Sequence, residues 1–207
     1  MRIAIANAKG GVAKTTTAIY LATAVTDRYG EATATVYDAD PQSSASLWAD
    51  AAETGGAGLG SEVRPANLST LGRLAAQDAG QERDRWDFVD APPQGRLLEA
   101  SIRSADFVVI PTSDSPLDLQ QAWAMLDEAR KTTSAAVLIV RAERSTTAFR
   151  QTEQALHDAA TPRFDTVVPK RQEVKKALGS RPARTYEYRD LLNELEQVRR
   201  DMTGEGR

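Results

Sequence analysis

The sequence predicts an α/β fold in which a single doubly wound, mostly parallel sheet carries helices on both faces. Two observations support this. Short apolar runs alternate with helical patterns along almost all of the 207 residues, and those runs are continuous, as in strands buried on both faces. A chain of this length suits one large domain. We therefore expect residues 1–207 to form a single domain, with only about 203–207 frayed.

The strands are expected where the apolar runs are rich in Val and Ile and end near Asp, Pro or Asn. In chain order they are Ile3–Ala6, Thr35–Tyr37, Phe88–Val89, Phe107–Ile110, Val137–Val140 and Thr166–Val168. Repeated β-then-α units imply right-handed crossovers. In such sheets ligands bind at the carboxyl ends of the strands.

Two helices have clear patterns. Apolar residues within 119–129 recur at i, i+3, i+4 and i+7 and predict a buried stripe. Before them, Ser115 and Pro116 indicate a helix start, and capping explains Asp118 without a catalytic role. The last helix carries apolar residues within 188–198 on one face, so we expect it to dock on the core.

Composition excludes several classes of site. The chain has no cysteine and one histidine, which rules out disulfides, iron–sulfur ligation, cysteine nucleophiles and multi-histidine metal sites. Net charge is −3, which on average disfavours nucleic acid. No apolar run approaches the ~20 residues of a membrane span, and no signal peptide is evident. We expect a cytoplasmic protein without a membrane partner.

The strongest motif joins the first strand to the first helix. It reads Lys9-Gly10-Gly11-Val12-Ala13-Lys14-Thr15-Thr16. Backbone N–H groups of such a turn converge on phosphate oxygens at a helix N-terminus. Lys14 would reach the β- and γ-phosphates, and the Thr15 hydroxyl would hold Mg²⁺. Ala8 and Ala13 occupy the glycine positions of the strict pattern, so an ordinary glycine-rich turn is the alternative.

Acidic residues follow two of the expected strands. Asp38 and Asp40 come after the second strand, and Asp90 ends the strand at Phe88–Val89. Carboxylates beside a triphosphate can hold metal-bound water or orient the attacking water. Considered alone, each of these acidic residues could be a solvated acid in or before a proline-containing turn. All three motifs in this order favour a nucleotide site.

With these motifs the chain resembles the ParA/MinD-type ATPases, which are P-loop NTPases with a deviant Walker A motif. The run from Lys9 to Thr16 resembles that motif, Asp38–Gln42 the second acidic motif, and Phe88–Pro93 Walker B with switch II. Asp106–Pro111 and Pro169–Gln172 also have counterparts there. The resemblance covers residues 1 to about 190 and is nearest to the small ParF-like plasmid partition proteins. Since the first strand begins at residue 2, we expect no preceding helix-turn-helix domain.

The resemblance implies three catalytic residues. Lys9 matches the lysine that reaches the phosphates of the partner in an ATP-sandwiched dimer. Supplied in trans, such a cation is comparable to an arginine finger. Lys14 matches the phosphate lysine, and Asp40 matches the acid that positions water for attack on the γ-phosphate.

The same resemblance implies the remaining ATP and Mg²⁺ contacts. Thr15 matches the magnesium ligand and Asp90 the Walker B acid, with Asp38 in the same cluster. Pro169 and Arg171 lie where the family builds part of its adenine pocket. Ala13 departs from the family's glycine, and if its φ is positive the residue costs ~1–2 kcal/mol.

A basic segment lies near the C-terminal end. Between Arg163 and Arg189 there are eight Lys or Arg and three Asp or Glu, a local charge of 8 − 3 = +5. In the resembling family this region contributes to nonspecific DNA binding by the ATP-bound dimer, which a doubled basic patch favours. The candidate DNA contacts are Lys170, Lys175, Lys176, Arg181 and Arg184. The alternative is a solvated basic face.

The expected function is that of an Mg²⁺- and ATP-dependent switch for plasmid partition. A homodimer would form with ATP, bind nonspecific DNA on the nucleoid and hydrolyse ATP to ADP slowly until a ParB-like centromere-binding partner stimulates it. One alternative is a MinD-like positioning ATPase for a membrane or protein cargo. Another is a metabolic ATP-dependent ligase of the same superfamily.

Overall fold

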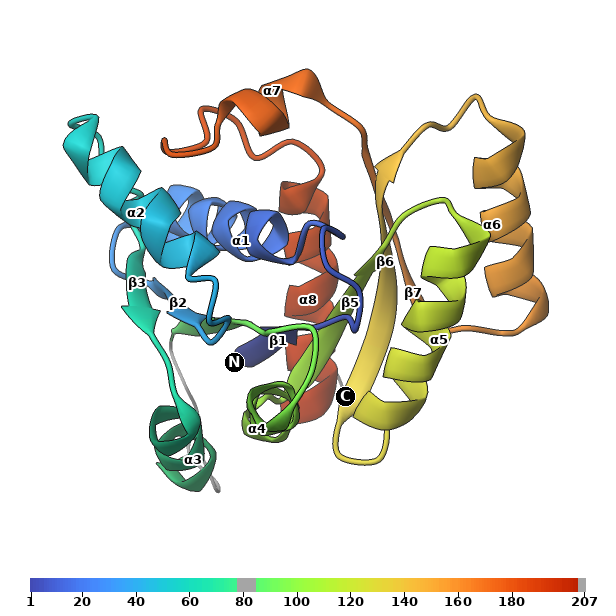
Figure 1. Cartoon of the computed structure of the whole chain (residues 1–207), viewed down its shortest axis with the longest axis horizontal. Coiled ribbons are helices and arrows are strands. Elements are labelled where there is room, and N and C mark those ends of the chain that lie inside the picture. The colour runs from blue at the N-terminus through green and yellow to red at the C-terminus, as the bar shows by residue number, and fades with distance from the viewer. Residues whose placement is uncertain (78–84, 205–207) are drawn as a thin grey trace.

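The computed structural model describes residues 1–77 and 85–204, which build one parallel sheet covered by helices (Figure 1). The strands are β1 (Arg2–Ile5), β2 (Ala34–Asp38), β3 (Glu62–Pro65), β4 (Trp86–Asp90), β5 (Phe107–Thr112), β6 (Ser134–Ala142) and β7 (Arg163–Pro169). The helices are α1 (Lys14–Tyr29), α2 (Ser44–Thr54), α3 (Leu68–Gln77), α4 (Arg96–Ser104), α5 (Pro116–Ala129), α6 (Thr147–Asp158), α7 (Gln172–Lys176) and α8 (Tyr188–Thr203).

The strand order is β3-β2-β4-β1-β5-β6-β7, and every pairing is parallel. The predicted fold class is confirmed. Five of the six expected strands fall within observed ones, and the first, expected at Ile3–Ala6, overlaps β1 but extends one residue beyond its end at Ile5. The edge strand β3 was not predicted. Among the described strands it pairs with β2 alone. Its side chains are mostly exposed and Val63 is its one large apolar residue, so no apolar run marks it.

Side chains of the strands alternate between two cores. Ile3 and Ile5 pack with α1, α2 and α8 on one face, whereas Ala4 packs with α3, α4, α5 and α6 on the other. Burial on both faces explains the continuous apolar runs. This arrangement leaves the carboxyl ends of β1, β2 and β4 and the loops beyond them free to form a site.

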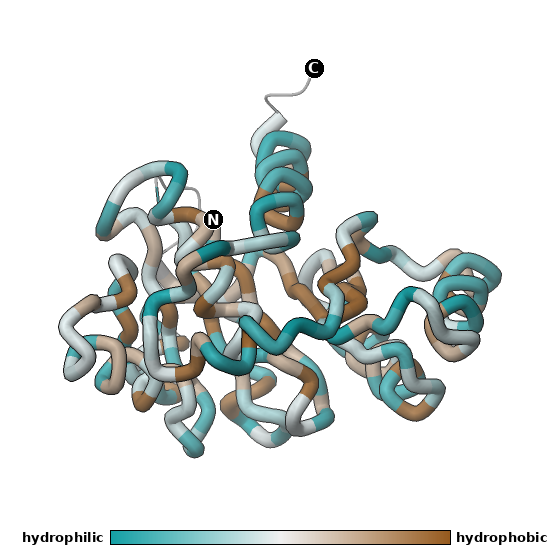
Figure 2. Tube along the Cα trace, turned by 90° about the horizontal axis from the view of Figure 1, so that it is seen from above, coloured by the Kyte–Doolittle hydropathy of each residue, from teal (hydrophilic) through white to brown (hydrophobic). Residues whose placement is uncertain are grey.

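The last helix docks as predicted. Tyr188 and Leu195 are buried against the sheet, and Val198 is half-buried. Figure 2 shows that the turns of α8 nearest the C-terminus are mainly hydrophilic, so its first half anchors it. Fraying was expected at about 203–207, but the helix continues to Thr203, and residues 205–207 lie outside the described residues.

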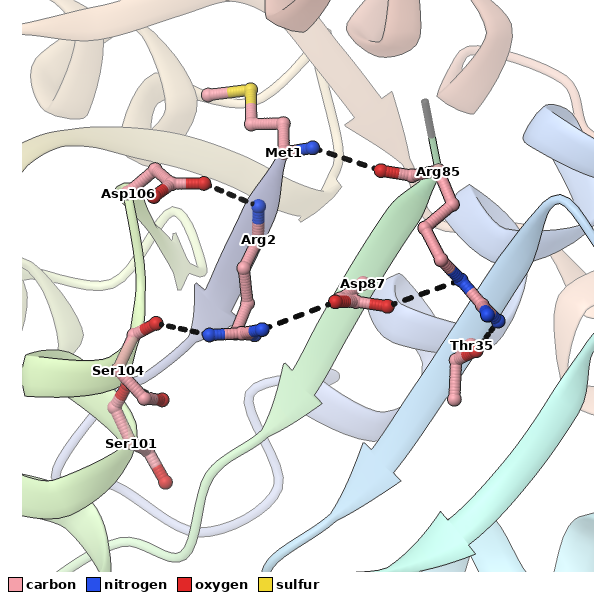
Figure 3. A network of polar contacts seen from close by, with 8 residues as sticks. All are labelled: Met1, Arg2, Thr35, Arg85, Asp87, Ser101, Ser104 and Asp106. Atoms are coloured by element: carbon pink, nitrogen blue, oxygen red, sulfur yellow. Dashed lines mark hydrogen bonds and ion pairs between the residues drawn. The ribbon is translucent and has the colours of Figure 1, made fainter. Parts of the chain in front are cut away.

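A buried polar network holds the amino ends of the central strands together (Figure 3). The guanidinium of Arg2 donates to Asp87 at 3.3 Å and to the Ser104 carbonyl at 3.0 Å, and Arg2 is only 2% exposed. The Arg2 backbone N–H donates to Asp106 at 2.6 Å. The network thereby joins β1, β4 and the start of β5.

The D87A variant is expected to lower the free energy of unfolding by ~3–5 kcal/mol, because it removes a buried carboxylate that accepts from the buried guanidinium of Arg2. Urea unfolding followed by circular dichroism measures this. The matched control is E62A, which breaks a pair with Arg64 whose side chains are both about half exposed. That variant should change stability by less than ~1 kcal/mol. Equal losses of stability in D87A and E62A would contradict a stabilising role for the buried contact between Arg2 and Asp87.

Candidate nucleotide site

The loop between β1 and α1 opens onto a cavity of about 1040 Å³, which is large enough for a nucleotide. Of the predicted ATP residues, the ones that line it are Gly10, Gly11, Ala13, Lys14, Thr15, Thr16, Pro169 and Arg171. Val12 is buried beneath the loop, and Lys9 is not among the lining residues. Since α1 begins at Lys14, its N-terminal N–H groups lie at the cavity, as anion binding requires.

Lys14 is held inside this loop. Its side chain is buried, and its Nζ donates to the Lys9 carbonyl at 3.1 Å. Burial lowers the pKa of Lys14, while Asp90 and Asp40 act in the opposite direction. An amine enclosed by the loop and lining the cavity is placed to neutralise phosphate oxygens.

Two acids meet at adjacent strand ends beside the loop. Asp38 of β2 lies in register with Asp90 of β4, and the Thr15 hydroxyl donates to Asp90 Oδ2 at 2.6 Å. Ser46 donates to Asp38 Oδ2 through its N–H at 2.8 Å and its hydroxyl at 2.7 Å. The Oδ1 atoms of Asp38 and Asp90 are buried and have no hydrogen-bond partner among the described residues.

Whether Mg²⁺ fits this site depends on the ligands around the two Oδ1 atoms that have no hydrogen-bond partner. A hydroxyl and one or two carboxylates, with water and phosphate completing the shell, are the ligands that Mg²⁺ prefers. Groups of three or more acidic or histidine side chains that could hold a metal ion are absent from the described part of the chain. Burial raises the pKa of Asp90 to about 7, so a bound cation would favour its charged form.

Asp40 lies beyond β2 on the wall of the same cavity. Its Oδ1 accepts the Gln42 N–H at 2.9 Å, which fixes the turn that carries it. Asp40 is half-buried, unlike Asp38 and Asp90. A carboxylate that is partly open to water at the cavity wall can orient an attacking water.

Part of the cavity wall is apolar. The apolar lining residues include Trp48, Val168, Val174 and Leu178. Arg171 lies over the Tyr186 ring at 4.8 Å and forms an ion pair with Glu187. Apolar walls with a few polar groups suit a purine base, and the predicted adenine residues are therefore in a suitable place.

The sequence matches the family described as the CobQ/CobB/MinD/ParA nucleotide binding domain over residues 3–181. The chain belongs to this family. This confirms the broad resemblance to ParA/MinD proteins on which the residue roles were based.

Two curated relatives bear the name "Maintenance of carboxysome distribution protein A". One from Gloeobacter kilaueensis is 34% identical over 80% of this chain and 75% of its own length. One from Halothiobacillus neapolitanus is 29% identical over 85% of this chain and 82% of its own. The sequence predicted that the nearest relatives would be ParF-like plasmid partition proteins. These two relatives are named for carboxysome distribution instead.

Solved structures agree on the fold. The ATP complex of Cyanothece McdA has a TM-score of 0.71 and 19% identity, covering 94% of this chain and 96% of that one. Cobyrinic acid a,c-diamide synthase from Mycobacterium smegmatis, with bound ADP and magnesium, has a TM-score of 0.68 and 21% identity, covering 98% and 96%. At these identities the likeness concerns the fold alone.

In this member of the CobQ/CobB/MinD/ParA family, the lysine at the start of the loop is held outside the cavity. Lys9 Nζ forms an ion pair with Asp118, and Ser113 donates to the other Asp118 oxygen at 2.6 Å. Burial favours the neutral acid, but the bonds from Lys9 and Ser113 hold the pKa of Asp118 below its usual range.

The explanation of Asp118 by helix capping is wrong. Although α5 begins at Pro116 as predicted, the Ser115 side chain makes no capping hydrogen bond, and the Asp118 carboxylate is engaged by Lys9 instead. Sequence spacing could not reveal this contact, because it joins residues 109 positions apart.

Arg141 is a second residue that the sequence analysis missed. It lines the cavity, and its guanidinium donates to the Gly11 carbonyl at 3.0 Å. Its φ of 56° falls at an irregularity between β6 and β7. Residues other than glycine rarely adopt this backbone conformation without a compensating contact. No motif in the sequence predicts a role for Arg141.

The predicted DNA residues are divided between several surroundings. Lys170 and Lys175 line the nucleotide cavity, and Lys170 forms an ion pair with Glu143 at 2.6 Å. Arg181 forms an ion pair with Asp27 at 2.9 Å. Lys176 and Arg184 are exposed. The five residues thus do not form one free patch on a single chain.

Ala13 adopts the backbone conformation that usually requires glycine. Its φ is 62° and its ψ is 31°, so the residue carries ~1–2 kcal/mol of strain. Ala8, by contrast, is not among the residues with positive φ, so glycine is not needed there.

The A13G variant is expected to raise the free energy of unfolding by about 1 kcal/mol and to bind ATP more tightly, because the strained methyl group beside the phosphate path is removed. Chemical denaturation, calorimetric titration with ATP and a turnover assay measure these changes. Indistinguishable stability, affinity and turnover in A13G and the parent would discard this explanation.

Proposed function

We propose that this chain is an Mg²⁺- and ATP-dependent ATPase that dimerises with bound ATP and positions a protein cargo on the nucleoid. The observation that carries the proposal is the location of Lys9. It belongs to the phosphate loop but lies outside the lining of its own cavity, paired with Asp118. A lysine so placed is available to a second chain.

The chemistry follows from the described side chains. Lys14 would neutralise the β- and γ-phosphates, while Thr15 with Asp90 and Asp38 would hold Mg²⁺, which supplies charge neutralisation when bound. Asp40 would orient the attacking water. Lys9 would leave Asp118 and contact the phosphates of the facing chain, so hydrolysis to ADP depends on the dimer. Turnover would be weak in the monomer.

The cargo is inferred from the named relatives. The motifs predicted plasmid partition, with a MinD-like positioning ATPase for a membrane or protein cargo as the alternative. Both curated relatives are named for carboxysome distribution, which supports the alternative. We therefore propose a protein assembly as cargo. An assembly-bound protein would then stimulate hydrolysis in place of a ParB-like centromere-binding protein.

Nonspecific DNA would serve as the surface on which the ATP-bound dimer is retained. Lys176 and Arg184 are exposed and do not line the nucleotide cavity, so they are the best candidates for phosphate contacts. A dimer doubles these cations and steepens the salt dependence of binding. None of the helices in residues 1–77 and 85–204 is long and apolar enough to cross a membrane.

The test is a fluorescence anisotropy titration with a random-sequence DNA duplex in ATP, in ADP and without nucleotide. Binding in ATP should be at least tenfold tighter and should weaken as salt rises. The K176E/R184E variant should lose this binding and keep ATP affinity. DNA binding that is equal in all three conditions, or absent at low salt, would contradict this part of the proposal.

A metabolic ligase remains the rival, because the solved synthase shares the fold. It would require an organic acceptor to consume ATP. Release of phosphate by the purified chain with ATP, Mg²⁺ and DNA alone, at a rate that rises with protein concentration, supports the switch. Turnover strictly dependent on a small carboxylate acceptor would support the ligase.

A further inference from the structure

A second hollow lies on the sheet face opposite α1 and α8, between α3 and α4. Its volume is about 250 Å³. The residues that line it, which we call the α3–α4 groove, are Leu68, Leu71, Gly72, Ala75, Arg96, Ala100 and Arg103. These two helices pack side by side on the sheet (Figure 1).

The floor of the α3–α4 groove is apolar and open. Leu71 is fully buried at its base, whereas Leu68 is 41% exposed at its edge. A Cβ built on Gly72 would meet no atom within 4 Å, so there is room for an apolar side chain to enter. The groove therefore presents a small apolar floor that one or two side chains of a partner can contact.

The rim of the groove is cationic. Arg96 and Arg103 are exposed and lie seven residues apart on α4, which places them on the same side of the helix about 10 Å apart. In the part of the chain that the structure describes, no hydrogen bond or ion pair occupies either guanidinium. The exposed Glu99 of the same helix does not line the groove. An apolar floor between two free arginines is complementary to apolar side chains flanked by carboxylates.

The groove is connected to the nucleotide site through the backbone. Asp90 ends β4, and the five residues 91–95 lead directly into α4 at Arg96. Within that segment Pro92, Pro93 and Gln94 line the nucleotide cavity. A ligand that contacts α4 therefore contacts the helix that begins where the nucleotide-lining segment ends.

We propose that the α3–α4 groove binds an acidic amphipathic helix of a protein partner. The partner helix would place apolar side chains over Gly72 and Ala100 and carboxylates against Arg96 and Arg103. This inference rests on the proposed function, since a positioning ATPase needs a protein partner, and it names the chemistry of that partner. Helix-in-groove recognition of this kind uses anchors at i, i+3 or i+4, and i+7.

The test selects binders from a displayed library of 16-residue helices on the nucleotide-free full chain. Two variants alter the groove. The G72L variant fills the open floor, and R96E/R103E reverses the rim. Leucine is a better helix former than glycine, so we expect G72L to keep α3 folded and a loss of binding to report on the groove. The R73E variant, at an exposed arginine of α3 outside the groove, is the matched control.

We expect the selected peptides to be rich in Asp and Glu around a leucine stripe. Their affinity should fall at least tenfold for G72L and for R96E/R103E and stay within twofold for R73E. The proposal is overturned if no peptide is enriched, if the enriched peptides lack excess acids, or if they bind all variants equally. It is also overturned if G72L prevents self-association, which would assign the groove to a second copy of this chain. Because the binding assay needs no ATP, its outcome is independent of the proposed ATPase activity.

Discussion

The K9A variant is expected to lose ~10³–10⁵-fold of the dimer-dependent ATP turnover while keeping ATP affinity within about threefold. The lysine lies outside its own cavity and is paired with Asp118, so removing it leaves Lys14, Thr15 and the acids in place. Turnover per chain should rise with protein concentration in the parent and stay flat in K9A. A fluorescent ATP analogue measures binding, and phosphate release measures turnover.

Two further variants distinguish a role of Lys9 in the facing chain from damage to the structure around Lys9. K9A removes the cation that pairs with the Asp118 carboxylate, so the K9A/D118N double variant restores the charge balance and should show the same loss of turnover. K131A removes a fully exposed lysine that is paired with Glu128 and should behave as the parent. Unchanged concentration-dependent turnover in K9A would rule out the trans lysine.

The D90N variant is expected to be more stable than the parent above pH 7 and defective with Mg²⁺. The pKa of Asp90 is raised from 3.8 to about 7 by burial. The folded chain therefore holds a proton that the unfolded chain has lost between about pH 4 and 7, and stability falls as pH rises through that window. Each pKa unit is worth about 1.4 kcal/mol, so D90N should gain about 2–4 kcal/mol at pH 8.

Thermal melts of the nucleotide-free chain between pH 5 and 8.5 measure this difference. The parent should lose stability toward pH 8 relative to D90N, and D50N, an exposed acid of α2, should follow the parent. With ATP present, D90N should need ~10–100-fold more Mg²⁺ for the same occupancy. Parallel melting curves for D90N and the parent across the pH range would contradict the assignment of Asp90 as the buried metal-site acid.

The sequence predicted most of the fold and the centre of the site because both depend on local patterns. Continuous apolar runs predicted the strands, and the loop from Lys9 to Thr16 with Asp38 and Asp90 predicted the nucleotide site. Adjacent parallel strands bring Asp38 and Asp90 into register, which explains why acids 90 − 38 = 52 positions apart could be assigned to one site. Alanine in place of glycine at position 13 carries strain because the φ of this residue is positive.

The remaining features depend on contacts between distant residues. The bond between Lys9 and Asp118 and the bond from Arg141 to Gly11 join segments that no periodicity connects. The edge strand β3 is stabilised by main-chain pairing with β2 rather than by an apolar run. The division of the basic segment into paired and exposed cations likewise depends on which acids lie nearby, Asp27 and Glu143 among them.

The central claim is that ATP joins two chains through their phosphate loops. Sedimentation or light scattering should be measured on D40A, in which we expect hydrolysis to be arrested, with Mg²⁺ and ATP, with ADP and without nucleotide. The account predicts the mass of two 22.4 kDa chains with ATP and of one chain in the other two conditions. A single-chain mass in all three conditions, under saturating ATP, would contradict it.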